Sequence, residues 1–474
     1  MALIERTDGL LLQAIAADDT TLRRLAYADP QAFPVLLDSA ARGPLSRYSI
    51  LAAYPQATLW QDGRGQLQAS PGQVPSAAGF LAALDHCWRA ERQPHRSIAQ
   101  PTAQDEPPGP FRGGWMVFLG YELAAEVEPL LDLVAPEQPE ASSPAAFALR
   151  IACGLVHDHL TQQSWAFAEA GRDDLLANLN QALAQLGPIE RSGAARLRVA
   201  EEAPRRFRAR VEAALEYIRA GDIYQANLSR PWRARLPRRL ALQPAAIGLY
   251  ERLRAVNPAP FAGLAQFRDW RLLSSSPERL VRVVGGRIET RPIAGTRPRS
   301  GAPDDEAHEI AALIGHPKER AEHVMLIDLE RNDLGRICRA GSVRADQFMH
   351  IESYPHVHHI VSNVGGELLP QVTPVDVLRA VFPGGTITGC PKFRCMQIIA
   401  ELEAEARQAY TGGLGYINLD GSMDFNILIR SLTLQAGALE FRTGAGIVAD
   451  SDWQRELTET RAKARGVLAA VSDA

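Results

Sequence analysis

Residues 410–471 carry the pattern that decides the fold: "YTGGLGYINLDGSMDFNILIRSLTLQAGALEFRTGAGIVADSDWQRELTETRAKARGVLAAV". Three runs rich in apolar, β-branched and aromatic residues, at 410–419, 424–435 and 439–449, predict consecutive strands. Residues 452–471 then place apolar side chains at helical spacing and predict a closing helix. The C-terminal part of the chain is therefore expected to be a series of strands followed by a helix.

The same mixture of elements extends towards the N-terminus. Residues 34–55 predict strand, turn and strand, and residues 147–158 and 261–289 add further strand runs. Long helices are predicted over 205–222, where Gly221 is a C-cap candidate, and over about 304–331. Because there is no regular βαβ alternation, we expect a mixed α/β chain rather than a Rossmann or TIM architecture.

Composition narrows the functional class. The chain has 474 residues, 46% of them hydrophobic, and a net charge of −4, which gives no bulk electrostatic reason to bind nucleic acid or an anionic membrane. The five cysteines show no CxxC spacing and are expected to be reduced thiols. Acidic residues interrupt the N-terminal apolar run, so no signal peptide is predicted and a cytoplasmic location is expected.

Two carboxylate pairs have i, i+3 spacing on predicted helices: Glu319 with Glu322, and Glu456 with Glu459. Two such helix faces brought together would form an all-oxygen site for a hard cation such as Mg²⁺. The alternative is that both pairs belong to solvated helix surfaces, since helices rich in Glu and Arg contain many such pairs.

Several further features point to an anionic substrate. A Gly-rich turn at 382–396, expected between a strand-like run and a helix that starts near Lys392, could present backbone N–H groups. A second small-residue turn is expected at 442–451, and Arg430 lies in an apolar strand run, where an unpaired charge is costly. With the Gly-Thr pair in "RPIAGTRPRS" (291–300), these features favour a substrate with more than one carboxylate.

Glu278, in "SSSPERL" (274–280), lies beside a proline at the edge of a predicted strand. A carboxyl group withdrawn from water has a raised pKa and can act as a general acid. A surface ion pair with a neighbouring arginine is the alternative. His358 and His359 show no metal-like spacing with the cysteines.

Eight stretches within 205–470 resemble, in family order, the chorismate-utilising enzymes, in particular component I of aminodeoxychorismate synthase and of anthranilate synthase. They are "GDIYQANLSR", "SSSPERL", "RPIAGTRPR", "HPKERAEHVMLIDLERNDLGR", "ESYPHVHHIVSNV", "FPGGTITGCPKFRCMQIIAELE", "YTGGLGYINLDGSMDFNILIRSL" and "GAGIVADSDWQRELTETRAKA". "LLDS" and "LSRYSILA" near the N-terminus resemble the family's N-terminal sheet segment.

The resemblance implies an α/β (α+β) fold of two large antiparallel β-sheets packed face to face, with helices outside. It implies an N-terminal segment (1–190), with a region similar to a tryptophan pocket, that docks on a chorismate-binding catalytic domain (205–474). It also implies Mg²⁺ as cofactor and ammonia as co-substrate. Because the chain has no Gly-x-Cys-x-Gly turn and no matching His-x-Glu, a separate glutamine amidotransferase subunit is expected to supply the ammonia.

The resemblance also assigns roles residue by residue. Direct metal ligands are expected at Glu322 and Glu459, with water-mediated partners at Glu319 and Glu456. Substrate-binding positions are expected at Gly295, Thr296, Thr386, Tyr416, Arg430, Gly444, Ala445 and Gly446. Glu278 matches the acid that protonates the departing 4-hydroxyl, Lys392 and His359 line the pocket, and Gln225 stands where water-adding relatives carry a base lysine. Ser39 matches the tryptophan-pocket serine of anthranilate synthases.

The two closest members of the family place the amino group differently, on C4 in aminodeoxychorismate synthase and on C2 in anthranilate synthase. Four stretches favour the first: "YQANL" with Asn227, "NPAPFAG" (257–263), "GGTITG" and "MDFNI" with Asn426. Ala294 favours the second, because many aminodeoxychorismate synthases have a nucleophilic lysine there. The sequence therefore predicts C4 amination without that lysine, and anthranilate synthesis is the alternative. Gln225 argues against a water-adding enzyme, and the retained acids argue against a non-catalytic relative.

Overall fold

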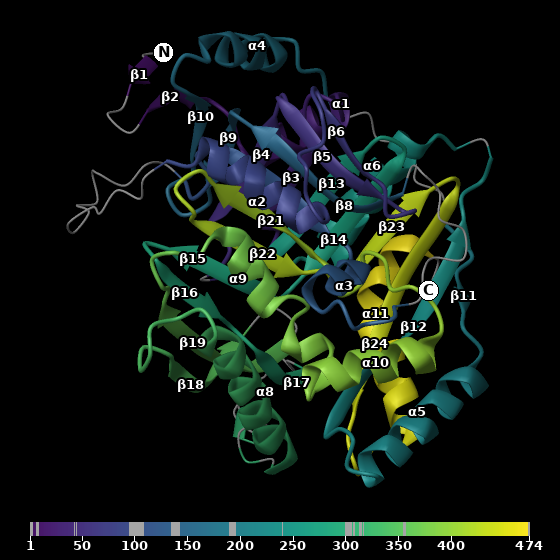
Figure 1. Cartoon of the computed structure of the whole chain (residues 1–474). Coiled ribbons are helices and arrows are strands. Elements are labelled where there is room, and N and C mark those ends of the chain that lie inside the picture. Colours follow the sequence, from purple (N-terminus) through teal and green to yellow (C-terminus); the bar gives the residue numbers. More distant parts are fainter. Residues whose placement is uncertain are drawn as a thin grey trace.

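The structure is a computed structural model that describes residues 3–5, 9–41, 43, 45–93, 109–133, 143–188, 196–238, 240–298, 306, 309–311, 315, 317–353 and 357–472. Within them the chain forms one 13-stranded and one 11-stranded sheet, and each strand pairing is antiparallel (Figure 1). The predicted pair of large antiparallel sheets is confirmed.

The 13-stranded sheet has the order β1 (Leu3–Glu5), β2 (Leu10–Ile15), β10 (Gln163–Glu169), β9 (Cys153–Asp158), β4 (Tyr48–Ala53), β3 (Val35–Asp38), β13 (Phe261–Phe267), β14 (Trp270–Ser276), β23 (Ser431–Gln435), β24 (Ala438–Ile447), β12 (Gln225–Arg235) and β11 (Ala200–Glu201), and β20 (Gly389–Cys390) pairs with β12. The 11-stranded sheet has the order β17 (Ile293–Pro298), β19 (Val357–Glu367), β16 (Arg287–Thr290), β15 (Arg279–Val284), β22 (Met423–Ile427), β21 (Gly413–Asn418), β7 (Gly114–Leu119), β8 (Pro144–Ile151), β5 (Ala57–Asp62) and β6 (Leu67–Ser70), and β18 (Arg344–Ser353) pairs with β19.

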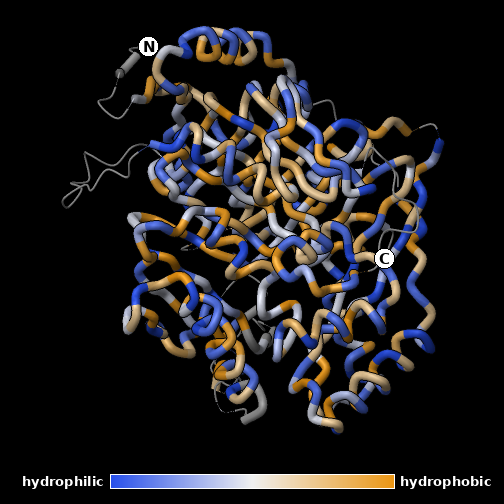
Figure 2. Tube along the Cα trace, viewed as in Figure 1, coloured by the Kyte–Doolittle hydropathy of each residue, from blue (hydrophilic) through white to orange (hydrophobic). Residues whose placement is uncertain are grey.

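The two sheets pack face to face through an aromatic core. The ring centroids of Phe118 and Trp270 lie 4.8 Å apart, and those of Phe147 and Phe267 lie 4.9 Å apart. Each pair joins a strand of one sheet to a strand of the other, and offset or tilted aromatic pairs stabilise a core beyond the area that they bury. Figure 2 shows hydrophobic residues along the central strands, whereas the outer helix α4 (Asp173–Ala184) alternates between hydrophilic and hydrophobic turns.

Helices cover the outer faces of both sheets. The 13-stranded sheet packs against α1 (Asp19–Ala28), α4, α6 (Leu242–Val256) and α11 (Trp453–Val471). The 11-stranded sheet packs against α2 (Phe80–Glu91), α8 (Pro317–Gly335) and α9 (Pro374–Val381). A separate apolar cluster joins α5 (Pro204–Arg219) and α10 (Lys392–Glu403) to β12 and β24. The connections between these elements contain three short helical segments, η1 (Tyr121–Leu123), α3 (Ala124–Val127) and η2 (Gly385–Ile387).

Strands from residues 1–190 enter both sheets. β3 pairs with β13 in the larger sheet, and β7 pairs with β21 in the smaller one. The early part of the chain is therefore built into the same sheets as the later part. No helix among the described residues is both long enough and apolar enough to cross a membrane.

Two of the points at which the chain passes from one sheet to the other are neighbours in space. Pro277 and Glu278 connect β14 of the larger sheet to β15 of the smaller one, and residues 428–430 connect β22 to β23. The single strand predicted over 424–435 is therefore wrong, because the chain changes sheets at Leu428, which is fully buried. The Ser275 amide donates to the Arg430 carbonyl at 3.2 Å and the Ile427 amide donates to the Glu278 carbonyl at 3.1 Å, so the two crossings lie side by side.

Other predicted elements shift in detail. Helix α9, rather than a strand, precedes the Gly-rich turn, and α10 begins at Lys392 as expected. Residues 442–447 lie inside β24, so the small-residue stretch starts as a strand and not as a turn. Helix α8 ends at Gly335, and most of the predicted helix before Pro317 lies outside the described residues.

Candidate active site

Glu278 lies in the first crossing and is 6% exposed. The Thr386 hydroxyl, on η2, donates to its Oε1 at 2.8 Å. Burial raises the pKa of Glu278 to about 7, although this hydrogen bond and the positive charges of Lys463 and Arg430 act in the opposite direction. A carboxyl group with a pKa near neutrality can deliver a proton to a leaving group.

Arg430 lies in the second crossing, with a left-handed backbone φ of 52°. Desolvation lowers the pKa of its guanidinium, and the nearby groups that counteract this are Tyr410, Glu278 and Glu459. Arg430 lies in an apolar run of the sequence, but it belongs to the connection between β22 and β23 and not to a strand. The two crossings thus bring the carboxyl group of Glu278 and the positive charge of Arg430 to one place. This arrangement suits an anionic substrate with a leaving hydroxyl.

Strands β12 and β24 form a polar surface next to the crossings. Asn227 is opposite Gly446 and Ser229 is opposite Gly444 in the register, so Gln225, Asn227 and both glycines face the same side. A Cβ atom at Gly446 would lie 2.5 Å from Gln225 Nε2, and one at Gly444 would lie 2.5 Å from Asn227 Oδ1. Glycine is therefore required at both positions for the two amide side chains to lie over β24. Ala445 faces the opposite side, in the apolar cluster with α10 and α11.

The predicted metal carboxylates reach this surface from different helices. Gln225 Nε2 donates to Glu322 Oε1, on α8, at 3.0 Å. Glu459, on α11, forms an ion pair of 2.7 Å with Lys463, whose Nζ also donates to the Gly444 carbonyl at 3.0 Å. Glu456 is buried on the first turn of α11, and the side chain of Glu319 lies outside the described residues.

The donor atoms at this surface fit a hard cation in their chemistry. Besides the two carboxylates, Gln225 Oε1 is buried and has no hydrogen-bond partner among the described residues. Carboxylate and amide oxygens are ligands that Mg²⁺ accepts. The described part of the chain holds no group of three or more His, Cys, Asp or Glu side chains arranged around a metal position. An ion here would therefore depend on Glu322, Glu459 and neighbouring neutral oxygens.

Lys392 forms a buried ion pair with Asp333 of α8, and its Nζ also lies 3.4 Å from the Val381 carbonyl. Glu330, one turn earlier on α8, has its pKa raised to about 8 by burial and by the negative charge of Asp333, and it interacts electrostatically with Glu278. The expected pocket lysine thus sits in a cluster of buried acids behind η2.

The stretch "RPIAGTRPRS" (291–300) contributes a strand to the smaller sheet. Residues 293–298 form β17, and the pairing with β19 shifts between Ala294 and Thr296 because Gly295, at φ 67°, forms a bulge. The stretch is thus a strand with a bulge rather than a turn. The Ile293 amide hydrogen-bonds to Glu278, which places the backbone at Ala294 beside the acid. His359 is buried opposite Thr296, and the side chains of Ala294 and Thr296 lie outside the described residues.

Tyr416, expected to act together with Arg430, lies in the core between the sheets, where its ring centroid is 5.3 Å from that of Phe111. The tyrosine that interacts with Arg430 is Tyr410. Sequence reasoning also missed Lys463. The spacing Glu459-x-x-x-Lys463 on one helix face was the available signal, because an i, i+4 pair of this kind keeps both side chains together.

Ser39 lies at the end of β3, is 8% exposed, and donates to the Tyr48 carbonyl at 2.7 Å and the Pro260 carbonyl at 3.4 Å. The neighbouring Asp38 carboxylate accepts from Arg254 at 2.8 Å and from Tyr250 at 3.1 Å. The polar groups around Ser39 thus form hydrogen bonds with one another and with the 257–263 stretch.

We therefore expect L-tryptophan to leave the activity unchanged, because an amino acid would have to break these internal contacts to bind beside Ser39. Initial rates measured across a tryptophan titration check this. Inhibition at micromolar tryptophan would contradict it and favour anthranilate synthesis.

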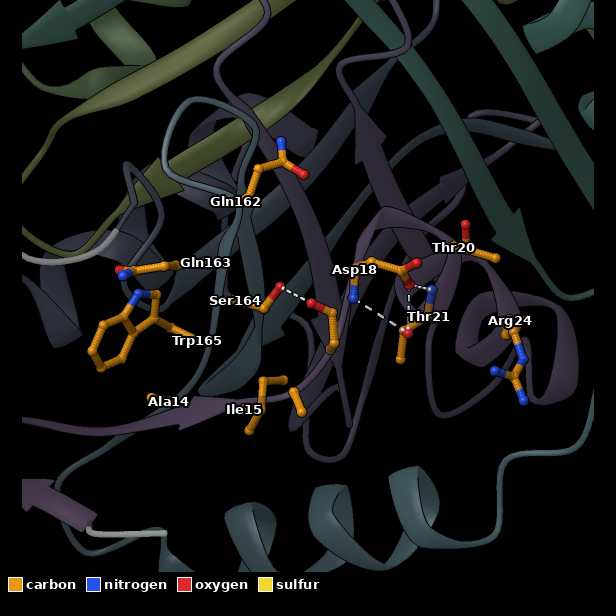
Figure 3. A pocket seen from close by; sticks show the side chains of 12 residues that line it. Ala14, Ile15, Asp18, Thr20, Thr21, Arg24, Gln162, Gln163, Ser164 and Trp165 are labelled. Carbon is orange, nitrogen blue, oxygen red and sulfur yellow. Dashed lines mark hydrogen bonds between the residues drawn. The ribbon is translucent and has the colours of Figure 1, made fainter.

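A cleft of about 660 Å³ opens between β2, α1 and β10 (Figure 3). Its polar groups are largely used in local structure: the Thr21 amide donates to Asp18 Oδ1 at 2.7 Å, and the Ser164 hydroxyl donates to the Ala17 carbonyl at 2.7 Å. No predicted site residue lines it. The cleft therefore lies apart from the chemistry assembled around Glu278.

Comparison with known proteins identifies the family of this chain. The family model described as chorismate binding enzyme matches residues 52–469. An "Anthranilate synthase component I-like protein" of Synechocystis sp. is 40% identical over 90% of this chain and 83% of its own length. An "Aminodeoxychorismate synthase component 1" of Bacillus subtilis is 38% identical over 91% of this chain and 90% of its own length.

Among solved structures, anthranilate synthase component I from Streptococcus pneumoniae superposes with a TM-score of 0.76 at 30% identity, covering 90% of this chain and 93% of that one. The relatives thus agree on the fold and on the family, while their names divide between two products.

Proposed function

Because the chain belongs to the chorismate-binding enzyme family and so is an enzyme that acts on chorismate, we propose that it is component I of an aminodeoxychorismate synthase. In this proposal it converts chorismate and ammonia to 4-amino-4-deoxychorismate, for p-aminobenzoate and folate biosynthesis. Ammonia comes from a separate glutamine amidotransferase subunit.

The observation that carries the proposal is the buried, hydrogen-bonded Glu278 beside Arg430. Replacing the 4-hydroxyl by an amine forms one C–N bond and breaks one C–O bond. Protonated Glu278 gives its proton to the hydroxyl, which leaves as water. Ammonia loses one proton after it attacks, and the Glu278 carboxylate can take that proton back, so the acid is regenerated and atoms balance.

Arg430, the β12–β24 surface and a bound Mg²⁺ would supply the rest of the chemistry. Arg430 would bind one carboxylate of the substrate, and the backbone at residues 444–446 of the β12–β24 surface would contact the remainder. Glu322 and Glu459 would hold Mg²⁺, which when bound withdraws electron density from the ring through its carboxylate. In the structure these two carboxylates are held by Gln225 and Lys463, which orient them towards the same pair of strands.

Amination at C4 is favoured by the four stretches named above, and two of them lie at the acid. Asn227 of "YQANL" donates to the carbonyl of Thr386 of "GGTITG" at 3.4 Å, and Thr386 in turn donates to Glu278. The other two meet each other, since Asn426 donates to the Phe261 carbonyl at 3.0 Å. Anthranilate synthesis is the second candidate, favoured by Ala294 and by the name of the Synechocystis relative.

The product formed from chorismate, Mg²⁺ and ammonium, separated by chromatography, tests the proposal. We expect 4-amino-4-deoxychorismate, with the enolpyruvyl group retained and no pyruvate released. With glutamine in place of ammonium, the purified chain should be inactive until an amidotransferase subunit is added. Anthranilate with stoichiometric pyruvate would overturn the assignment of C4, and glutamine hydrolysis by the chain alone would overturn the separate partner.

Ala294 carries a prediction of its own. Alanine has no nucleophile, so no covalent enzyme–substrate adduct should form at this position, and ammonia is the simplest first nucleophile if C4 is substituted by two displacements. Mass spectrometry of protein quenched during turnover should show the unmodified mass. An adduct on a lysine elsewhere in the chain, such as Lys392, would show that a different residue acts as the nucleophile and would exclude the ammonia-first route.

A further inference from the structure

We infer that Asn227 and Tyr410 form the binding site for the incoming ammonia. The inference rests on the proposed function, in which ammonia is the nucleophile. It concerns two residues that the family resemblance gives no role in binding the nucleophile, and it follows from one unsatisfied oxygen atom.

Asn227 is 8% exposed, and its polar groups are used with one exception. Its amide donates to the Thr388 carbonyl at 2.8 Å, and its carbonyl accepts from Arg407 Nη2 at 2.6 Å. Its side-chain Nδ2 donates to the Thr386 carbonyl at 3.4 Å. Within the described part of the chain, Oδ1 has no hydrogen-bond partner. A buried acceptor without a partner is destabilising, so the fold keeps this oxygen available at the expense of stability.

Gly444 allows Oδ1 to lie close to the backbone of β24. A Cβ atom there would lie 2.5 Å from Asn227 Oδ1 and 2.7 Å from the Tyr410 hydroxyl oxygen. The two oxygens therefore face the same point on β24, and any side chain at position 444 would collide with both. Two oxygens that lie this close to one point of the backbone can both accept from one small molecule that carries several N–H donors.

The same two residues are connected to the acid. Asn227 holds the carbonyl of Thr386, whose hydroxyl donates to Glu278, and Tyr410 interacts with Arg430. Arg407 stiffens this arrangement, because it also donates to the Ile387 carbonyl at 3.1 Å, on the same turn as Thr386. A nucleophile bound at Oδ1 is thus held by the segment that positions the leaving-group acid.

Neutral oxygens suit ammonia better than a carboxylate would. A carboxylate next to the nucleophile would favour ammonium, which has no lone pair to attack with, whereas a neutral amide and a neutral phenol accept N–H donors without adding a negative charge. Burial raises the pKa of Tyr410 to about 12, so its hydroxyl stays neutral at physiological pH.

Steady-state kinetics of the whole chain with ammonium as nitrogen source test the inference. The rate is followed as chorismate consumption at fixed pH, so that it does not depend on which product forms. Asn227→Leu removes the acceptor with little change in size. We expect Asn227→Leu to raise the KM for ammonium about tenfold, the equivalent of about 1.4 kcal/mol, and to leave the KM for chorismate within about twofold.

Two further variants keep the result interpretable. Tyr410→Phe removes the second oxygen but keeps the ring, and should also raise the KM for ammonium even if Asn227→Leu folds poorly. Asn426→Leu is the matched structural control: Asn426 is also buried, but its Oδ1 accepts from the Leu414 amide at 3.0 Å and its Nδ2 donates to the Phe261 carbonyl. It should lower the melting temperature without changing the KM for ammonium.

The outcomes separate this inference from the proposed function. If Asn227→Leu raises the KM for chorismate and not that for ammonium, the oxygen binds the ring hydroxyl, and the ammonia site is wrong. If neither KM changes in Asn227→Leu or Tyr410→Phe, the oxygens bind no substrate and the inference also fails. Anthranilate as the wild-type product would instead overturn the assignment of C4 and leave the ammonium kinetics as an independent test.

Discussion

Replacing Glu278 by glutamine should lower kcat by about 10³-fold and leave the fold intact. Glutamine has nearly the same shape and can still accept the hydrogen bond from Thr386, but it has no proton to give to the leaving hydroxyl. General acid catalysis contributes about 10²–10⁴-fold to a rate. The measurement is kcat by chromatographic assay, with circular dichroism to verify folding.

The pH dependence gives an independent check on Glu278. Its pKa is raised to about 7, so the proton is present below that pH and is lost as the pH rises through it. Activity should therefore fall on the alkaline side of about pH 7. The hydrogen bond from Thr386 lowers this pKa, so Thr386→Val should move the alkaline limb to higher pH.

A second carboxylate, outside the candidate site, provides the control. Glu289, on β16, forms a partly exposed salt bridge with Arg282, and Glu289→Gln should retain activity. Wild-type activity in Glu278→Gln, or an alkaline limb that persists unchanged in that variant, would mean that another group protonates the hydroxyl.

Glu322→Gln and Glu459→Gln should each reduce activity by about 10²-fold or more, because loss of a carboxylate ligand removes the cation that polarises the substrate. A direct readout is the melting temperature in a Mg²⁺ titration with chorismate present, which should rise for the wild type and stay constant for both variants. Excess chelator should abolish wild-type activity.

Asp328 supplies the matched control on the same helix as Glu322. It is 64% exposed and pairs with Arg331, so Asp328→Asn should behave like the wild type in both assays. Full activity in excess chelator would exclude a catalytic metal, and a Mg²⁺-dependent shift that survives in both Glu variants would place the ion elsewhere.

Local patterns were sufficient to predict much of the fold. The apolar runs at 410–419 and 439–449 are strands β21 and β24, and the amphipathic end of the chain is α11. The proposed acid, the proposed metal carboxylates and the glycines were expected from motif resemblance, which depends on residue identity at fixed spacing. The structure then brings Glu278, Thr386 and Arg430 together and shows Gly444 and Gly446 under two amides.

The sheet crossings could not be predicted in this way. Residues 424–435 and 147–158 are continuous apolar runs, yet each changes sheets, at residues 428–430 and at Ala152. A strand buried in either sheet has the same apolar pattern, so only the partner strands decide where the chain crosses. The surroundings of Arg430 and Lys463 depend on this strand pairing. β23 pairs with β24 only up to Phe441, so the Gly444 carbonyl accepts from Lys463 instead.

The mixing of early and late strands in both sheets has a consequence for how the chain reaches its native state. Trp88 donates to the carbonyl of Asn418, 330 residues later, and Leu119 pairs with Gly413. Contacts this distant in sequence cost much loop entropy before they contribute stability, which slows folding. On the ribosome, β7 cannot gain β21 as its partner until residues 413–418 have emerged, so its edge stays open during most of synthesis. Such open edges favour association between chains, and we expect refolding yields to fall as protein concentration rises.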